Sequence, residues 1–318
     1  MNPPTNRPDR AAALHKARAR ATATSDDPSW PLHLAEDLHG IRADWKTSAE
    51  VCADAAWAAR SAGHSVLGLL SPEGVLATHR DPITTRTLAH LYLSALRFDF
   101  RCPTLQRLVE QLAQTARQPL DCYTRALYAF ALLGQSRPEG LTVMDEVLAT
   151  AEEHPKTLHV LLHGLWLGQD LNDGAERLLT LSSRPALATG TDPIVLFRTA
   201  GALRRLGRYD EGLSAIDRAI DCLPPGDISV HADLVRERSL LCAARDLHQH
   251  RSPTRTSSGC RHNPPPAPEG PLAARTAGRG ARAAPFPERG PDGVHRGRPL
   301  AGPGLLHPGR RAEDLDIG

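Results

Sequence analysis

His159 and His163 are the residues whose type and spacing first suggest chemistry. They stand four positions apart, so on a helix both imidazole rings lie on one face, where their nitrogens can bind one metal ion. The residues between them include no glutamate, and the sequence offers no obvious third ligand. We therefore favour packed or surface histidines, and we predict neither a metal site nor a bound cofactor.

Two adjacent acid pairs are the next candidates, because general acid–base catalysis uses positioned carboxylates. Asp145 precedes Glu146, and Glu152 precedes Glu153. Neighbouring residues of a helix point in different directions, so neither pair places two carboxylates on one face. A solvated helix face explains them.

Arg204, Arg205 and Arg208 form a basic cluster of a different kind. The cluster falls at the predicted C-terminal end of a helix, where positive charge complements the helix dipole. Arginine is also one of the residue types that dominate binding energy at protein interfaces. Both interpretations, helix end and partner contact, stay open at this point.

Familiar catalytic motifs are absent from the sequence. It contains no G-x-x-x-x-G-K-[ST] loop, no G-x-S-x-G turn and no H-E-x-x-H pair. Gly63, Gly68 and Gly74 are spaced too widely for a dinucleotide-binding turn. We predict that the protein is not an enzyme, and a catalytic site within residues 31–82 is only a third hypothesis.

Composition narrows the class of protein further. The 318 residues are 41% hydrophobic and 23% charged, as in globular proteins, but only 4% aromatic, which is few for a β-sandwich or barrel. The net charge is +2, so the folded part is not a basic platform for nucleic acid. Residues 245–318 carry 12 arginines against seven acids, and only this tail would attract polyanions weakly.

Cysteine usage and apolar runs bear on the cellular location. The six cysteines include no C-x-x-C pair, which favours reduced, buried thiols. The N-terminus lacks the apolar core of a signal peptide, and no segment approaches the ~20 apolar residues of a membrane span. We expect a soluble, cytoplasmic protein without membrane contact.

Composition shifts divide the chain into four zones. Residues 1–28 are predicted to be a disordered arm, residues 29–82 a helical region of unclear type, and residues 83–250 a helical repeat domain. Residues 251–318 form a Pro-, Gly- and Arg-rich tail that buries too little apolar surface to fold. A genuine disordered segment and a product of a shifted reading frame explain the tail equally well.

The elements that must position the candidate residues are helices, because apolar residues recur at helical spacing and strand-like alternation is missing. Residues 64–70 alone fit a short helix or a strand.

The ends of the predicted helices recur at regular intervals along the chain. Three Leu-Gly pairs, ending at Gly134, Gly168 and Gly207, lie 34 and 39 residues apart, and each precedes a second glycine, at Gly140, Gly174 and Gly212. We predict an all-α fold of antiparallel helical hairpins.

Residues 193–226 closely resemble one tetratricopeptide repeat, a helix–turn–helix unit with a period of about 34 residues. Leu196, Ala200 and Leu203 match the packing positions of the first helix, and Gly212 matches the small residue of the second. This resemblance implies an α-solenoid.

Weaker resemblance extends the array towards the N-terminus. Residues 120–154 and 155–189 look like degenerate copies, each with one extra residue in its turn. Residues 83–119 are a candidate fourth copy, in which Arg97 stands where glycine is expected.

The resemblance also implies a binding surface, because the first helices of such repeats line the concave face of a superhelix that grips a peptide or partner helix. Transferred residue by residue, the groove positions comprise Tyr128, Leu162, Trp166, Phe197, Arg204 and Arg205. Tyr128 and Trp166 fit the core equally well.

We therefore predict a non-catalytic protein–protein interaction module whose partner is an unidentified protein or peptide. The alternative is a sensor or regulatory domain of a bacterial transcription-control protein without a readable DNA-binding part. The helix expected over residues 228–249 has no following partner helix, so we expect Leu234, Leu240 and Leu241 to stay exposed and to promote self-association.

Overall fold

The computed structural model describes residue 19 and residues 27–76, 81–116, 118–150, 153–223 and 228–251. Within these residues it contains 13 helices and no strand, which confirms the all-α prediction. The predicted arm lies outside the described residues except for residues 19, 27 and 28, and so does the predicted tail except for residue 251. None of the described helices is long and apolar enough to cross a membrane.

The N-terminal helices gather around α6. They are α2 (Trp30–Gly40), α3 (Trp45–Ser61), α4 (Val66–Leu69), α5 (Pro72–Leu76) and α6 (Pro82–Phe98). Residues 64–70, which fitted a helix or a strand, contain the helix α4. The helices α2 to α5 all contact α6, whose residues 87–97 are buried without interruption. Because α6 also contacts α7 and α8, packing continues across the predicted domain boundary at residue 82.

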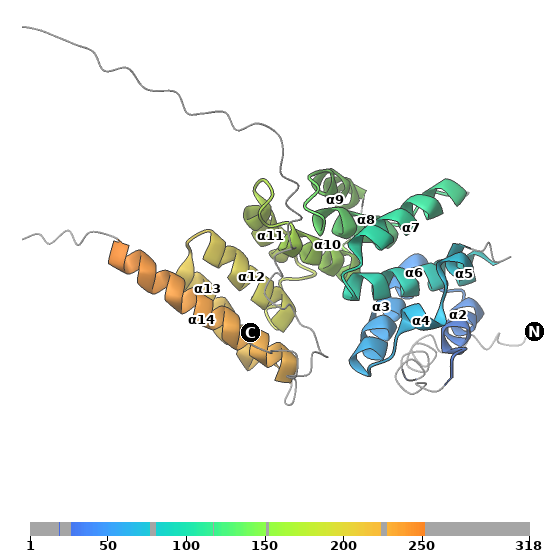
Figure 1. Cartoon of the computed structure of the whole chain (residues 1–318), viewed down its shortest axis with the longest axis horizontal. Helices are drawn as coiled ribbons and strands as arrows, with labels where there is room; N and C mark the ends of the chain where they lie inside the picture. The colour runs from blue at the N-terminus through green and yellow to red at the C-terminus, as the bar shows by residue number, and fades with distance from the viewer. Residues whose placement is uncertain are drawn as a thin grey trace, which may run out of the picture.

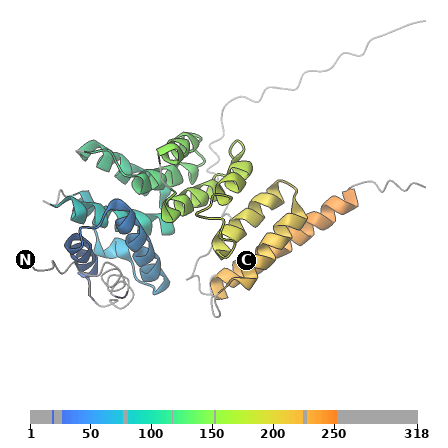
Figure 2. The same ribbon diagram turned by 180° about the vertical axis from the view of Figure 1, so that it is seen from behind.

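Six of the eight remaining helices in the described residues form three consecutive pairs, with α7 before them and α14 after them. The eight helices are α7 (Cys102–Thr115), α8 (Cys122–Leu133), α9 (Glu139–Thr150), α10 (Pro155–Leu167), α11 (Gly174–Ser182), α12 (Pro193–Arg205), α13 (Tyr209–Asp221) and α14 (Ile228–Arg251). The pairs α8–α9, α10–α11 and α12–α13 pack together, so residues 120–154, 155–189 and 193–226 each hold the expected helix–turn–helix. The helices α6, α8, α10, α12 and α14 contact one another in that order. The pairs follow one another along the long axis, as both views show (Figures 1 and 2).

Local sequence explains where these helices begin. The side chains of Asp44, Asp81, Asp121 and Asp192 each accept a hydrogen bond from a backbone N–H of the first turn, at 2.6–3.0 Å. These bonds satisfy donors that have no partner inside the helix. Proline in the first turn, as at Pro103 of α7, supplies the backbone angle that a helix start needs.

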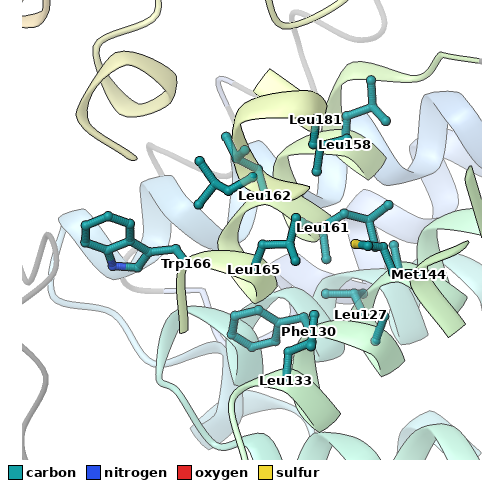
Figure 3. Close-up of a cluster of buried hydrophobic side chains, with 14 of the residues drawn as sticks. Leu127, Phe130, Leu133, Met144, Leu158, Leu161, Leu162, Leu165, Trp166 and Leu181 are labelled. Atoms are coloured by element: carbon teal, nitrogen blue, oxygen red, sulfur yellow. The ribbon is translucent and has the colours of Figure 1, made fainter. Parts of the chain in front are cut away.

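The centre of the array is a core of large aliphatic side chains (Figure 3). It joins α8 through α11, and its buried members include Leu127, Phe130, Leu133, Met144, Leu158, Leu161, Leu165 and Leu181. The same cluster continues from Ala49 of α3 to Leu241 of α14. This cluster therefore reaches from α3 to α14, and a second cluster, with Trp30, Leu34 and Leu38 among its members, joins α2, α3, α4 and α6.

The small residues predicted at the starts of the second helices do mark close approaches. A Cβ atom added to Gly212 would lie 2.6 Å from Leu241 Cδ2 and 3.3 Å from the carbonyl oxygen of Ala200. At Gly140 and Gly174 an added Cβ would also come within 3.0 Å of neighbouring atoms. Backbones that approach this closely leave no space for a larger side chain.

The expectation of an uncovered apolar stripe on the last helix is wrong for two of its three residues. Leu234 and Leu241 are buried, because they lie seven residues apart on the face of α14 that packs on α12 and α13. Leu240 is exposed, since one residue along a helix turns its side chain about 100° away.

Candidate functional site

Three of the predicted groove residues are core residues. Leu162, Trp166 and Phe197 are buried, and the rings of Trp166 and Phe197 lie 5.1 Å apart between their centroids. Trp166 lies so close to Gly201 that an added Cβ would be 2.3 Å from its ring. Figure 3 shows Trp166 at the edge of the leucine cluster. These side chains join α10 to α12 and offer no surface to a partner.

The other three predicted groove residues are partly exposed, and each has an intramolecular partner. The Tyr128 hydroxyl donates a hydrogen bond to Glu110 Oε1 at 3.0 Å. Arg204 Nε donates to Glu237 Oε1 at 2.7 Å, and Arg205 pairs with Asp170. Trp166, Phe197 and Arg204 lie near one another beside Gly201, because an added Cβ there would contact Trp166 and lie 3.5 Å from Glu237 Oε1, the atom that Arg204 bonds. Tyr128 instead bonds to Glu110 of α7.

A different site is present between α3, the end of α6, α10 and α12. It is a pocket of about 220 Å³, open to solvent on one side, in which charged and aromatic side chains meet. Its lining consists of Ala53, Asp54, Trp57, Arg97, Phe98, Phe100, Lys156, His159, His163, Asp192, Ile194 and Arg198.

Two buried arginines distinguish this pocket from an ordinary surface hollow. Arg97 is 6% exposed and Arg198 is 4% exposed. Within the described part of the chain, Nε of Arg97 and both Nε and Nη1 of Arg198 have no hydrogen-bond partner. Arg97 Nη2 donates to the carbonyl oxygen of His159 at 3.4 Å. Buried guanidinium groups are normally paired, so these three covered nitrogens without acceptors are unusual.

The electrostatics of the two arginines follow from burial. Burial and the charge of Arg97 together lower the pKa of Arg198 to about 9, although Asp192 opposes both effects. Burial also lowers the pKa of Arg97, which Tyr123 partly offsets. At neutral pH the lining of the pocket thus holds two neighbouring buried positive charges.

Both carboxylates of the pocket have partners within the protein. Asp54 accepts a hydrogen bond from Lys156 Nζ at 2.6 Å. Asp192 Oδ2 lies 3.1 Å from His159 Nε2, and Oδ1 of the same residue caps α12. Although burial alone would raise it, the contacts with His159 and with the backbone of α12 hold the pKa of Asp192 at about 2.

His159 and His163, the pair considered for metal binding, both line the pocket. His159 contacts Asp192, whereas His163 packs between the rings of Phe100 and Phe130 with centroid distances of 5.4 and 4.9 Å. Burial, and then the charges of the two arginines, hold the pKa of His163 well below its usual range. Among the described residues, no three His, Cys, Asp or Glu side chains are grouped to hold a metal ion.

Apolar side chains line the pocket beside these charges, and the Phe98 ring centroid lies 4.9 Å from Arg97 Cζ. Trp57 is 37% exposed, and its ring centroid lies 5.2 Å from that of Phe98. Phe100, Ile194 and Ala53 complete this apolar lining. The pocket therefore offers buried positive charge next to flat apolar surface.

Sequence reasoning found only part of this site. Arg97 drew attention as a departure from the repeat pattern, but Arg198 and Trp57 did not. A usable signal was present, because Arg198 interrupts an apolar run that begins at Ile194 and resumes at Ala200. A lone arginine in a helix segment that is otherwise buried indicates a specific electrostatic role.

Comparison with protein-family models, with curated proteins and with solved structures gave no match for this chain.

Proposed function

We propose that the chain is a non-catalytic binding module, an α-solenoid of tetratricopeptide-like hairpins that binds a protein or peptide at the face carrying the pocket. The single observation that supports this proposal is the pocket itself. It lies among α3, α6, α10 and α12, and α10 and α12 are the first helices of two successive pairs, which line the concave face in such an array. Trp57 and the two arginines belong to the residue types that anchor partners.

A second candidate is a sensor or regulatory domain of a transcription-control protein. The small volume of the pocket and its buried charges favour this candidate, because they suit a small effector better than a long peptide. In both cases the chain binds and does not catalyse.

Comparative capture tests the first candidate. The full chain, a Trp57→Ala variant and a Leu247→Ala control would each be immobilised and exposed to lysate of the source cells. Leu247 is also exposed, but it lies on α14 outside the pocket. We expect a protein that the wild type and the control retain and that Trp57→Ala loses. Identical sets of proteins on all three would contradict binding at this face.

A further inference from the structure

We propose that the pocket between α3, α6, α10 and α12 binds a small organic acid, a single carboxylate attached to a flat apolar group. The inference concerns the same pocket as the proposed function and specifies a ligand for it. It requires no protein partner, so the two proposals can fail separately.

The carboxylate is inferred from the charge of the two buried arginines that line the pocket. A guanidinium group presents N–H donors in a planar fork that matches the two oxygens of a carboxylate. Nε and Nη1 of Arg198 lack acceptors within the described residues, and so does Nε of Arg97. Both side chains line the pocket, so a bound carboxylate would neutralise their charge, and the covered nitrogens would have to turn toward the pocket to donate hydrogen bonds to it.

The charge balance favours a monoanion over a phosphate. With both histidines neutral, the lining carries the positive charges of Arg97, Arg198 and Lys156 against the carboxylates of Asp54 and Asp192. One positive charge is left in excess, which one carboxylate neutralises. A phosphate monoester carries about −1.5 to −2 at pH 7 and would be repelled by the two aspartates.

The apolar part is inferred from the apolar residues that line the pocket and from the size of the site. Trp57, Phe98 and Ile194 supply flat and branched apolar surface beside the arginines. Aromatic rings pack well against such surfaces in offset or edge-to-face geometry. The volume of about 220 Å³ lies below the roughly 300–1,000 Å³ of pockets for drug-sized ligands. The ligand is therefore small, with a body about the size of one ring.

Calorimetric titration of the full chain tests this inference with three probes. Phenylacetate combines one carboxylate with one ring, phenylacetamide is its neutral counterpart, and inorganic phosphate is an anion without an apolar group. We expect phenylacetate to bind, phenylacetamide to bind at least tenfold more weakly, and phosphate not to displace phenylacetate. Equal binding of acid and amide, or tighter binding of phosphate, would overturn the proposal.

Variants show whether Arg198 binds a ligand or only supports the fold. Arg198→Met keeps a long side chain and removes a buried charge that has no ion-pair partner, so we expect phenylacetate binding to fall at least tenfold while the melting temperature stays equal or rises. Arg205→Met is the matched control, because Arg205 lies on the same helix, outside the pocket, and pairs with Asp170. Unchanged binding together with a lower melting temperature for Arg198→Met would assign this arginine to structure and overturn the proposal.

A further variant keeps the test decisive if Arg198→Met does not fold. Trp57→Ala removes a partly exposed ring from the apolar lining, and we expect it to weaken phenylacetate binding while the helical circular dichroism spectrum is retained. Unchanged affinity would count against the proposed role of the apolar lining.

A peptide probe distinguishes failure of this inference from failure of the proposed function. An acetylated tripeptide ending in a phenylalanine carboxylate presents the same chemistry at the end of a chain. Binding of the tripeptide without binding of phenylacetate would overturn the small-acid proposal and leave the protein-binding proposal standing. Binding of phenylacetate, with no captured protein that depends on Trp57, would support the small-acid proposal and contradict the protein-binding proposal.

Discussion

Arg198 and Arg204 lie six residues apart on α12, and only Arg204 forms an ion pair among the described residues. Arg204 donates to Glu237, a carboxylate of α14 that is only 3% exposed, at 2.7 Å. Arg198 is buried, and two of its nitrogens have no hydrogen-bond partner among the described residues. The first arginine therefore supports packing of α14, whereas the second is costly to the free protein unless a ligand binds it.

Loss of the Arg204 side chain should destabilise the protein. Arg204→Met would leave Glu237 buried without its charge partner, at a cost of about 3 kcal/mol in the free energy of unfolding. Replacing Glu237 by methionine as well should recover most of this loss, because neither buried charge remains. Urea denaturation of both variants measures the two values. A single variant as stable as the wild type would indicate that Arg204 is available to a partner.

The buried imidazole of His163 should make stability depend on pH. Burial holds its pKa in the folded state well below 6.5, so below pH 6.5 the unfolded chain takes up a proton that the folded chain does not. The free energy of unfolding should therefore fall as pH falls below about 6.5, with a slope approaching 1.4 kcal/mol per pH unit from this residue.

His163→Leu isolates this contribution, because His154 and His159, whose pKa values are also lowered, stay in both proteins. Denaturation at a series of pH values from 7 to 5 should give a shallower slope for the variant. Parallel slopes for the two proteins would show that His163 does not titrate differently on folding.

At the scale of elements, helix positions and the close approaches at Gly140, Gly174 and Gly212 were predictable, because caps, prolines and small residues act within a few positions of the chain. The roles of the glycines in the turns were harder to predict. Gly207 has φ +72°, but the first two turns place their left-handed angles at Ser136 and Asp173. Gly134 has an ordinary helical φ, and an added Cβ there would lie 2.6 Å from Cys102 Sγ. The sequence does not reveal that contact with α7.

The crossing at Gly212 should tolerate no large side chain. Gly212→Leu would force α13 away from Ala200 and Leu241, and overpacking of this kind costs roughly 1–3 kcal/mol. Gly40→Leu is the control, because an added Cβ there meets no atom within 4 Å. Thermal unfolding should show a lower melting temperature for Gly212→Leu and little change for Gly40→Leu. Equal melting temperatures would mean that α13 packs differently.

At the scale of the molecule, the pocket was beyond sequence reasoning because its walls come from distant segments. Trp57, Arg97 and Arg198 span more than a hundred residues, and nothing local to any of them indicates the other two. They meet because α3 folds back on α6 and also contacts α10, which in turn contacts α12. The helical pattern predicts that such helices pack, but not which of their faces meet.

The order of the helices along the long axis predicts unequal stability within one molecule. The helices α8 and α10 lie in the middle of the core, with neighbours on both sides, whereas among the described helices α14 packs mainly on α12 and α13. In a linear array each unit is stabilised by its neighbours, so α14 should open more often than α8. Hydrogen exchange followed by mass spectrometry should show faster exchange in α14 than in α8 and α10.

Leu241→Ala turns this expectation into a test of the array. Leu241 is buried where α14 meets α13, and removing its side chain should loosen that end. If each helix is stabilised only by its neighbours, hydrogen exchange in Leu241→Ala should accelerate in α12, α13 and α14 and stay unchanged in α2 to α6. If the shared core makes the helices one cooperative unit, the slowest amides of α6 should accelerate by the same factor as those of α13. The second outcome would contradict the linear array and with it the proposed solenoid.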